Sequence, residues 1–296
     1  MRGRLPRAPR WRRHVAAVRR SLELPEPSLR SAGGVWAVGL VRDEADIVDT
    51  VVEHLLAQGV ERVVVADNGS RDGTSAILQN LAQTRPVTVV GDHLAAHYQA
   101  EKITLLARAA ARAGAAWVVP FDADELWSAP DGSIADWLDG CGAAVVQVPV
   151  FNHMPTEHDD AGEPDPVRRL RWRKRYPNRL HKVAFRSHPR ARLAQGNHGV
   201  SRRGRRTRGL EIRHFPYRSE EQFVRKVRQG GAALAATDLE AETGRHWRAL
   251  AARDDDSLRA AWRQIVTTHD VEFEWWVPPD DIVEDPARVS RLPLGR

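Results

Sequence analysis

The chain has 296 residues, 42% hydrophobic and 28% charged, with a net charge of +6. This composition excludes a disordered or collagen-like chain, because it supplies enough apolar residues for a substantial core. No apolar run approaches the ~18 residues of a membrane-spanning helix, and we find no secretory signal, so we expect a cytoplasmic protein. The single cysteine, Cys141, excludes an internal disulfide or a cysteine-rich zinc site.

The positive charge is concentrated in two segments. Residues 1–30 carry nine arginines against two glutamates, and residues 168–213 carry 17 basic residues against one glutamate. A basic segment in an otherwise acidic chain is typical of a site for an anionic ligand, such as a diphosphate, a nucleic acid or a lipid head group.

Residues 1–34, rich in Arg and Pro, predict a flexible basic arm whose middle, residues 11–24, has the pattern of a short amphipathic helix. We expect the arm to touch anionic lipid reversibly at the inner membrane face. Strand and helix patterns then alternate. The expected strands are 35–41, 62–66, 87–90 and 116–121, and the expected helices between them are 43–57, 74–83 and 96–113. This alternation predicts an α/β fold with a mostly parallel sheet flanked by helices, which binds ligands at the carboxyl ends of its strands.

Beyond residue 121 the alternation becomes irregular. We predict a short helix at 134–138, a strand at 143–150 and short strands at 182–186 and 210–214. A capping-box pattern at 219–222 opens a helix that runs to about residue 234, and further helices are expected at 245–252 and 257–268. The chain therefore ends in a basic and helical elaboration of the α/β core.

Two carboxylates, Asp122 and Asp124, directly follow the fourth predicted strand. An isolated Asp-x-Asp is usually a solvated turn. At the end of a strand in an alternating sheet, however, the pair favours a divalent cation, with positions left open for phosphate oxygens.

A second group of polar residues, 67–74, follows the second predicted strand. Asp67 offers a carboxylate to a nucleobase or ribose, and Gly69 and Gly73 permit a tight turn near a ligand. Taken alone, this segment reads equally as a turn that caps a helix.

Together these segments resemble glycosyltransferase family 2 and its GT-A, Rossmann-like fold. The resemblance is carried by residues 38–46, 67–74 and 121–125, and more distally by His198 and residues 214–226, which look like a bacterial branch of the family. It implies four regions, namely a flexible arm (1–34), a nucleotide-sugar-binding core (35–150), an acceptor-facing loop and basic segment (151–217) and C-terminal helices with a tail (218–296).

The resemblance also implies a chemistry. A hexosyl or related sugar would move from a nucleoside-diphosphate sugar to a hydroxyl of a saccharide, lipid-linked or other acceptor, with inversion and with help from Mn²⁺ or Mg²⁺. Asp122 and Asp124 would hold the metal. The residues expected to bind the donor are Arg42, Glu44, Asp67, Asn68, Lys102, Asp122 and Lys182.

Two roles remain open in the sequence. Either His198 or His214 fits a third metal ligand, although a histidine is more often structural. We prefer His198 because its glycine neighbours permit close approach. For the general base we prefer Asp159 over its alternatives in and near the polar loop, Glu125, Glu157 and Asp160.

Three other function classes compete with this interpretation. A phosphohydrolase of the haloacid dehalogenase type also uses Asp-x-Asp, but on its first strand rather than its fourth. A nucleic-acid-binding module would explain the arginines of 201–208 but not the three strand-end motifs, so we retain nucleic-acid binding only as an accessory activity and do not favour a nucleic-acid partner. A catalytically inactive protein that binds a nucleotide sugar is the main alternative.

Overall fold

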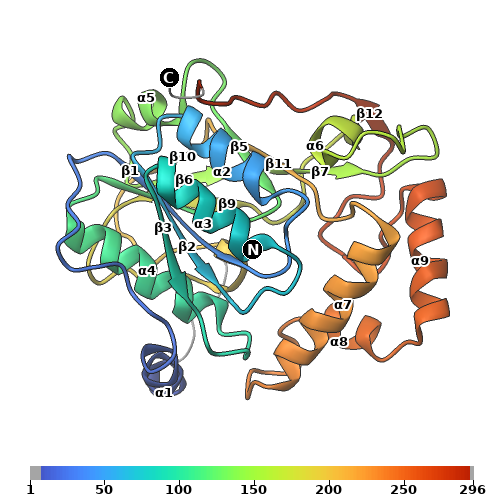
Figure 1. Cartoon of the computed structure of the whole chain (residues 1–296), viewed down its shortest axis with the longest axis horizontal. Helices are drawn as coiled ribbons and strands as arrows, with labels where there is room; N and C mark the ends of the chain where they lie inside the picture. The colour runs from blue at the N-terminus through green and yellow to red at the C-terminus, as the bar shows by residue number, and fades with distance from the viewer. Residues whose placement is uncertain (1–7, 294–296) are drawn as a thin grey trace.

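A seven-stranded sheet forms the centre of the computed structural model, which describes residues 8–293 (Figure 1). Its strand order is β10-β6-β9-β4-β1-β2-β3. β1 (Val35–Val41) pairs in parallel with β2 (Arg62–Asp67) and β4 (Trp117–Asp122), and β2 pairs in parallel with β3 (Val87–Gly91). The predicted α/β class and mostly parallel sheet are confirmed.

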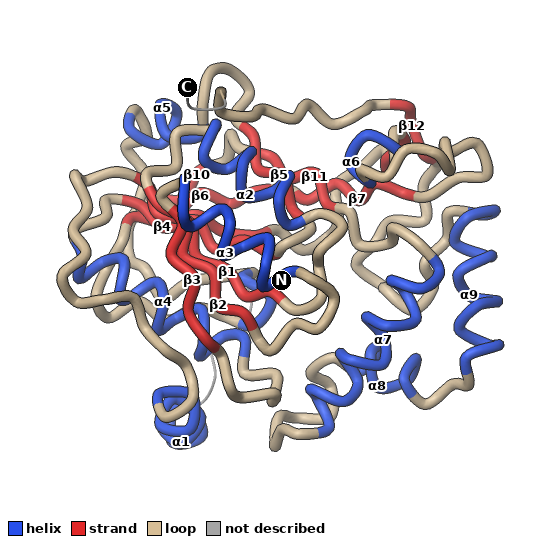
Figure 2. The backbone as a smooth tube through the Cα atoms, in the orientation of Figure 1, coloured by secondary structure: helices blue, strands red, loops and turns tan. Residues whose placement is uncertain are grey.

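Helices cover both faces of this sheet (Figure 2). Along β2, Val63 and Val65 join the core on one face, and Val64 and Ala66 join the core on the other. Because both faces are buried, the strands are continuous apolar runs. The first face packs against α2 (Val48–Ala57), α3 (Thr74–Thr84) and α5 (Ile134–Asp139), and the second packs against α4 (Gln99–Ala113).

The N-terminal region contains a helix, as its pattern favours, although this helix begins and ends earlier than residues 11–24. The described part of the region is packed and not a flexible arm. α1 (Ala8–Arg19) contacts α4, and it buries Trp11 and Val18. The ring of His14 stacks on Tyr98 with a centroid distance of 4.4 Å. These apolar residues recur at helical spacing on one face, and their burial offsets the cost of ordering the helix. The first seven residues of the predicted arm lie outside the described residues.

The central sheet also extends past residue 150, the expected end of the core. β9 (Lys182–Arg186) pairs antiparallel with β4 and with β6 (Val145–Val148), and β10 (Arg206–Thr207) pairs in parallel with β6. The segment expected to face the acceptor as a loop therefore contributes short strands to the sheets, and these strands bury apolar side chains such as Phe185.

A second sheet has five strands in the order β12-β8-β7-β11-β5. Its members are β5 (Glu125–Ser128), β7 (Val150–Met154), β8 (Trp172–Lys174), β11 (Glu211–His214) and β12 (Ile282–Glu284). β11 runs antiparallel to β5, with His214 opposite Glu125. Because β5 begins three residues after β4 ends, this pairing brings His214 to the end of β4.

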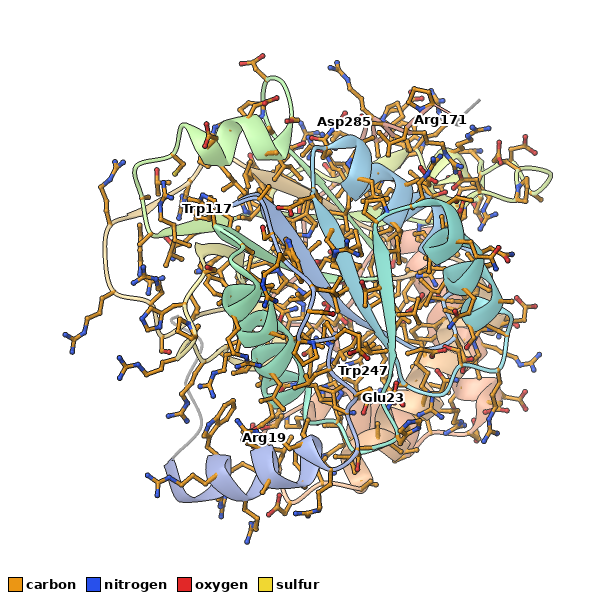
Figure 3. All side chains as sticks on the ribbon, turned by 60° about the vertical axis from the view of Figure 1, so that its left-hand side comes forward. Arg19, Glu23, Trp117, Arg171, Trp247 and Asp285 are labelled. Atoms are coloured by element: carbon orange, nitrogen blue, oxygen red, sulfur yellow. The ribbon has the colours of Figure 1, made fainter. Side chains whose placement is uncertain are left out.

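Three helices follow, α7 (Glu220–Ala235), α8 (Arg245–Ala251) and α9 (Asp255–Thr268), and they share a separate apolar core. The chain then returns to β8, where the amide of Asp285 donates to the Arg171 carbonyl at 3.0 Å (Figure 3). Two short helices, α6 (Pro166–Arg169) and η1 (Gln195–Asn197), lie in the connecting segments. Among residues 8–293, no helix has the length and apolar character needed to cross a membrane.

One buried histidine leads to a prediction about pH. His153 in β7 is stacked on Phe215 and hydrogen-bonded to the Leu170 carbonyl, and burial lowers its pKa to about 3. In the unfolded chain the imidazole of His153 binds a proton near pH 6.5. The contribution of the buried, neutral histidine to stability is therefore complete above that pH and is lost as the pH falls towards 3.

The unfolding free energy of wild type should fall between pH 7 and pH 5, and that of His153→Phe should fall by roughly 2 kcal/mol less. Urea unfolding at the two pH values measures this difference. His158→Gln, which changes an exposed histidine, should behave like wild type. Equal losses of unfolding free energy in wild type and His153→Phe would contradict a lowered pKa of His153.

Candidate active site at the strand ends

A cavity of about 990 Å³ lies at the carboxyl ends of β1 to β4. Its other walls come from the segment after β9, from α7, and from residues 242–249 and 272–276 of the C-terminal region. This is the edge of the sheet at which the alternation of strands and helices predicts ligands.

Asp122 ends β4 inside this cavity, with 29% of its side chain exposed. Lys182 pairs with Asp122 and lies 2.8 Å from a carboxylate oxygen of Glu125. Gln99 and Asn197 donate to Asp122 at 3.1 and 3.3 Å. Burial alone would lower the pKa of Lys182, but the two carboxylates outweigh it and raise that pKa. The lysine is therefore a fixed positive charge beside the motif.

Asp124 is buried and surrounded by cationic or basic groups from the distal part of the chain. It pairs with Lys226 of α7, and its carboxylate lies 3.4 Å from His214 Nε2 and 3.8 Å from the Arg218 guanidinium. Burial would raise the pKa of Asp124, but Lys226, His214 and Arg218 together hold it well below its ordinary value. Asp124 is therefore a permanent anion at this site.

The His214 ring is oriented by two asparagines. Asn178 donates to Asn152 Oδ1 at 2.8 Å, and the same oxygen lies 2.9 Å from His214 Nδ1. Since that oxygen can only accept, we assign the proton to Nδ1, which leaves His214 Nε2 directed at Asp124. An acceptor that fixes the other ring nitrogen in this way is typical of metal-binding histidines.

These residues fit a divalent cation only if substrate phosphates and water supply further ligands. Asp124 and His214 present one carboxylate and one imidazole nitrogen to the same point, but no cluster of three or more His, Cys, Asp or Glu side chains suited to a metal occurs among residues 8–293. Mg²⁺ is commonly held by one or two carboxylates together with substrate phosphates and water. The arrangement is compatible with that mode.

His198 lies in the same cavity, but a different partner holds it. Its Nδ1 donates to the His181 carbonyl at 2.8 Å, and burial, aided by the charge of Lys182, lowers its pKa to about 4. The structure thus brings His214, rather than the preferred His198, against Asp124. The pairing of β11 with β5 distinguishes the two histidines, and the local sequence does not contain that information.

The expected donor-side residues are brought together in part. Arg42, Glu44, Asn68 and Lys102 line the cavity. Asp67 instead accepts hydrogen bonds from its own loop, including Ser70 Oγ at 2.6 Å, and does not line the cavity.

Two of these residues meet at Asp92, a polar residue that follows β3 and to which the sequence had given no role. Asn68 Nδ2 lies 2.8 Å and Lys102 Nζ 2.6 Å from Asp92. Burial lowers the pKa of Lys102, although Asp92 offsets part of that effect. The position of Asp92 after the third predicted strand was the available signal.

Arg218 is a second residue that sequence reasoning missed. It is fully buried, pairs with Glu44 and lies 2.7 Å from Asp46, so it ties the end of β1 to the start of α7. Burial raises the pKa of Glu44, and Arg218 offsets part of that rise. The available signal was the motif at residues 214–226, from which Lys226 also comes.

Asp159, the expected general base, does not reach the cavity. Its carboxylate accepts hydrogen bonds from the amide and hydroxyl of Thr156 at 2.9 and 2.8 Å, a local turn that occupies both oxygens. A different acid, Glu274, lines the cavity, where it is buried near Tyr217. Burial raises the pKa of Glu274, and the Tyr217 hydroxyl offsets part of that rise.

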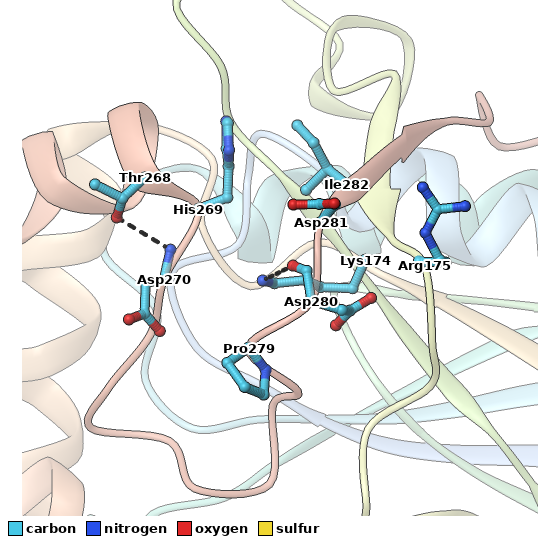
Figure 4. A pocket seen from close by; sticks show the side chains of 9 residues that line it. All are labelled: Lys174, Arg175, Thr268, His269, Asp270, Pro279, Asp280, Asp281 and Ile282. Atoms are coloured by element: carbon cyan, nitrogen blue, oxygen red, sulfur yellow. Dashed lines mark hydrogen bonds between the residues drawn. The ribbon is translucent and has the colours of Figure 1, made fainter.

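A second cavity, of about 570 Å³, lies between β8 and residues 268–282 (Figure 4). Lys174 Nζ crosses it to donate to the Asp280 carbonyl at 2.7 Å, and the Asp270 amide donates to Thr268 at 3.2 Å. None of its lining residues belongs to the larger cavity. The Lys174 bond holds the C-terminal segment against β8, whereas the Asp270 bond stays within residues 268–270.

The sequence matches the family described as Glycosyl transferase family 2 over residues 40–194. Among solved structures, Staphylococcus aureus TarS 1-349 in complex with UDP-GlcNAc is similar, with a TM-score of 0.39, 12% identity and coverage of 78% of this chain and 72% of that one.

Glucosyl-3-phosphoglycerate synthase from Mycobacterium tuberculosis in complex with Mn²⁺, UDP-glucose and phosphoglyceric acid gives a TM-score of 0.30 at 16% identity, over 52% of this chain and 57% of that one. No curated protein matches the sequence significantly.

Proposed function

Since this chain belongs to glycosyl transferase family 2, we propose that it moves a sugar from a nucleoside-diphosphate sugar to an acceptor hydroxyl in the 990 Å³ cavity. The observation that carries the proposal is the convergence of Asp122, Asp124 and His214 with Lys182 and Lys226 at one strand end. The diphosphate gains negative charge as the sugar departs. Fixed positive charges can neutralise it directly, and fixed carboxylates can hold a metal ion that does so.

On the donor side, Arg42, Glu44, Asn68 and Lys102 would contact the nucleoside and its phosphates. Asp92 positions Asn68 and Lys102 and would act through them. Asp67 would stiffen the adjoining loop through Ser70, so its replacement would act indirectly on binding.

A divalent ion, Mn²⁺ or Mg²⁺, would neutralise part of the charge on the leaving diphosphate when bound. We propose Asp124 and His214 as its protein ligands, with Asp122 close by, and we no longer prefer His198 for that role. Lys182 and Lys226 carry positive charge at the same strand end and would stabilise the departing phosphates directly.

We propose Glu274 as the general base. Its carboxylate would take the proton of the acceptor hydroxyl while that oxygen forms a bond to the anomeric carbon and the bond from that carbon to the diphosphate breaks. Such a single displacement inverts the configuration at the anomeric carbon. The cavity position and burial of Glu274 support this role.

Nucleotide-dependent thermal stability tests the proposed function. We expect one of UDP, GDP, CDP, ADP and dTDP to raise the melting temperature by about 5 °C at 100 times its Kd, and to do so more strongly with Mn²⁺. Inorganic pyrophosphate controls for simple anion binding. Stabilisation by no nucleotide would contradict the proposal, and binding without turnover of the matching nucleotide sugar would favour the inactive alternative.

The cellular site stays a prediction. We propose a cytoplasmic enzyme that touches the inner membrane face through the exposed arginines of α1, including Arg12, Arg13 and Arg19. Such contact would be reversible and salt-sensitive, because charge attraction without a lipid anchor is screened by salt.

A further inference from the structure

An aromatic wall lines one side of the cavity, opposite in character to the strand ends. We define it as His246, Trp247, Phe273, Trp275 and Trp276. Trp276 makes edge contacts with Trp275 and His246, at centroid distances of 5.8 and 4.6 Å.

Trp275 differs from its neighbours in the wall. The side chains of Trp247, Phe273 and Trp276 pack against the apolar core of α7, α8 and α9, so their positions are fixed. Trp275 is 53% exposed, and it is one of three large hydrophobic side chains exposed in the part of the chain that the structure describes. Neither of the others, Leu24 and Tyr176, lines the cavity. An exposed indole on a rigid support, inside a cavity, is typical of a ligand-binding surface.

The charged groups beside the wall indicate what kind of ligand it takes. Glu272 and Glu274 lie three positions and one position before Trp275, and both line the cavity. Glu242 also lines it, with Arg245 as the nearby basic residue. Carboxylates accept hydrogen bonds from hydroxyl groups but repel phosphates and anionic lipid. The basic residues Arg42, Lys102 and Lys226 lie on the donor side of the same cavity.

The two parts of the cavity therefore differ in chemistry. The strand-end part contains four basic side chains beside its carboxylates and suits a diphosphate. The other part is aromatic and mainly acidic and suits a neutral ring that carries hydroxyl groups. A volume of about 990 Å³ is at the upper end of the range for small-molecule sites and leaves room for two ligands.

We infer that the aromatic wall is the acceptor subsite and that it binds a neutral saccharide, whose ring stacks on Trp275 while its hydroxyls donate to Glu272 and Glu274. This inference rests on the proposed function. It narrows the acceptor from any hydroxyl compound to an uncharged sugar, and it brings the acceptor hydroxyl to the proposed base.

Fluorine NMR of protein labelled with 5-fluorotryptophan tests the inference, with the Trp275 signal identified by its loss in Trp275→Phe. The probes are the methyl β-glycosides of glucose, galactose, mannose and N-acetylglucosamine, each added in the presence of the stabilising nucleotide and Mn²⁺. We expect at least one of them to shift the Trp275 signal in a saturable manner.

Variants then separate stacking from general damage. Trp275→Ala should weaken binding of that glycoside at least fivefold, Trp275→Phe should stay within about twofold of wild type, and Tyr176→Ala, which removes an exposed ring outside the cavity, should change nothing. Nucleotide affinity should be the same in all four proteins.

Three outcomes would overturn the inference. They are a Trp275 signal unmoved by every glycoside, tighter binding of glucose 6-phosphate than of the neutral sugars, or a shift caused only by phosphatidylglycerol vesicles. If the nucleotides also fail to bind wild type, the proposed function fails. If nucleotide binds and no glycoside does, only the acceptor assignment fails.

Discussion

Asp124→Asn is expected to lower the rate of sugar transfer at least about 100-fold, because it removes the charge that faces His214 and that would help to hold the metal. Asp122→Asn should cause a loss of similar size, since Asp122 ends the same strand. The measurement is kcat for release of the nucleoside diphosphate, with Mn²⁺ and nucleotide affinity followed by isothermal titration.

The two variants should differ in stability. Asp122 is partly exposed, so its variant should fold as well as wild type. Asp124 is buried among Lys226, Arg218 and His214, so its loss leaves positive charge uncompensated and should cost about 3 kcal/mol of unfolding free energy. The two carboxylates therefore differ in burial, although both follow the same predicted strand.

Asp160→Asn provides a control, because it removes an exposed carboxylate outside the cavity. It should retain wild-type activity and stability. Metal affinity and kcat that are unchanged in both motif variants would refute the assigned role of the pair.

Glu274→Gln is expected to lower kcat by a factor of roughly 100 to 10,000 while nucleotide affinity stays within about twofold of wild type, because glutamine keeps the shape of the side chain but cannot accept the proton. Wild-type activity should fall at acidic pH, as Glu274 becomes protonated. Burial raises the pKa of Glu274, so this fall should begin at a higher pH than for an exposed glutamate.

The comparison with Asp159→Asn decides between the two candidate bases. Asp159 closes a turn with Thr156, so its variant should keep kcat near the wild-type value and lose only some stability. Loss of kcat in Asp159→Asn together with normal turnover in Glu274→Gln would identify Asp159, and not Glu274, as the general base.

The sequence alone was sufficient for the four parallel strands of the central sheet, β1 to β4, and for the place of the candidate site at their ends. Apolar runs such as 35–41 and 62–66, separated by helical spacing, are local patterns, and parallel pairing brings the carboxyl ends of β1 to β4 to one edge. Asp122, Asn68 and Lys102 could therefore be assigned to one cavity, because each is at the end of a strand or on the adjoining helix.

The choice among chemically equivalent side chains depended on tertiary structure. Lys226 lies 102 positions from Asp124, and Arg218 lies 174 positions from Glu44, so no local pattern relates them. The same holds for two proposed roles. The preference for His214 over His198 follows from the pairing of β11 with β5, and the preference for Glu274 over Asp159 depends on how the C-terminal segment folds back. Local periodicity encodes the elements and their ends, whereas long-range packing decides which charges meet there.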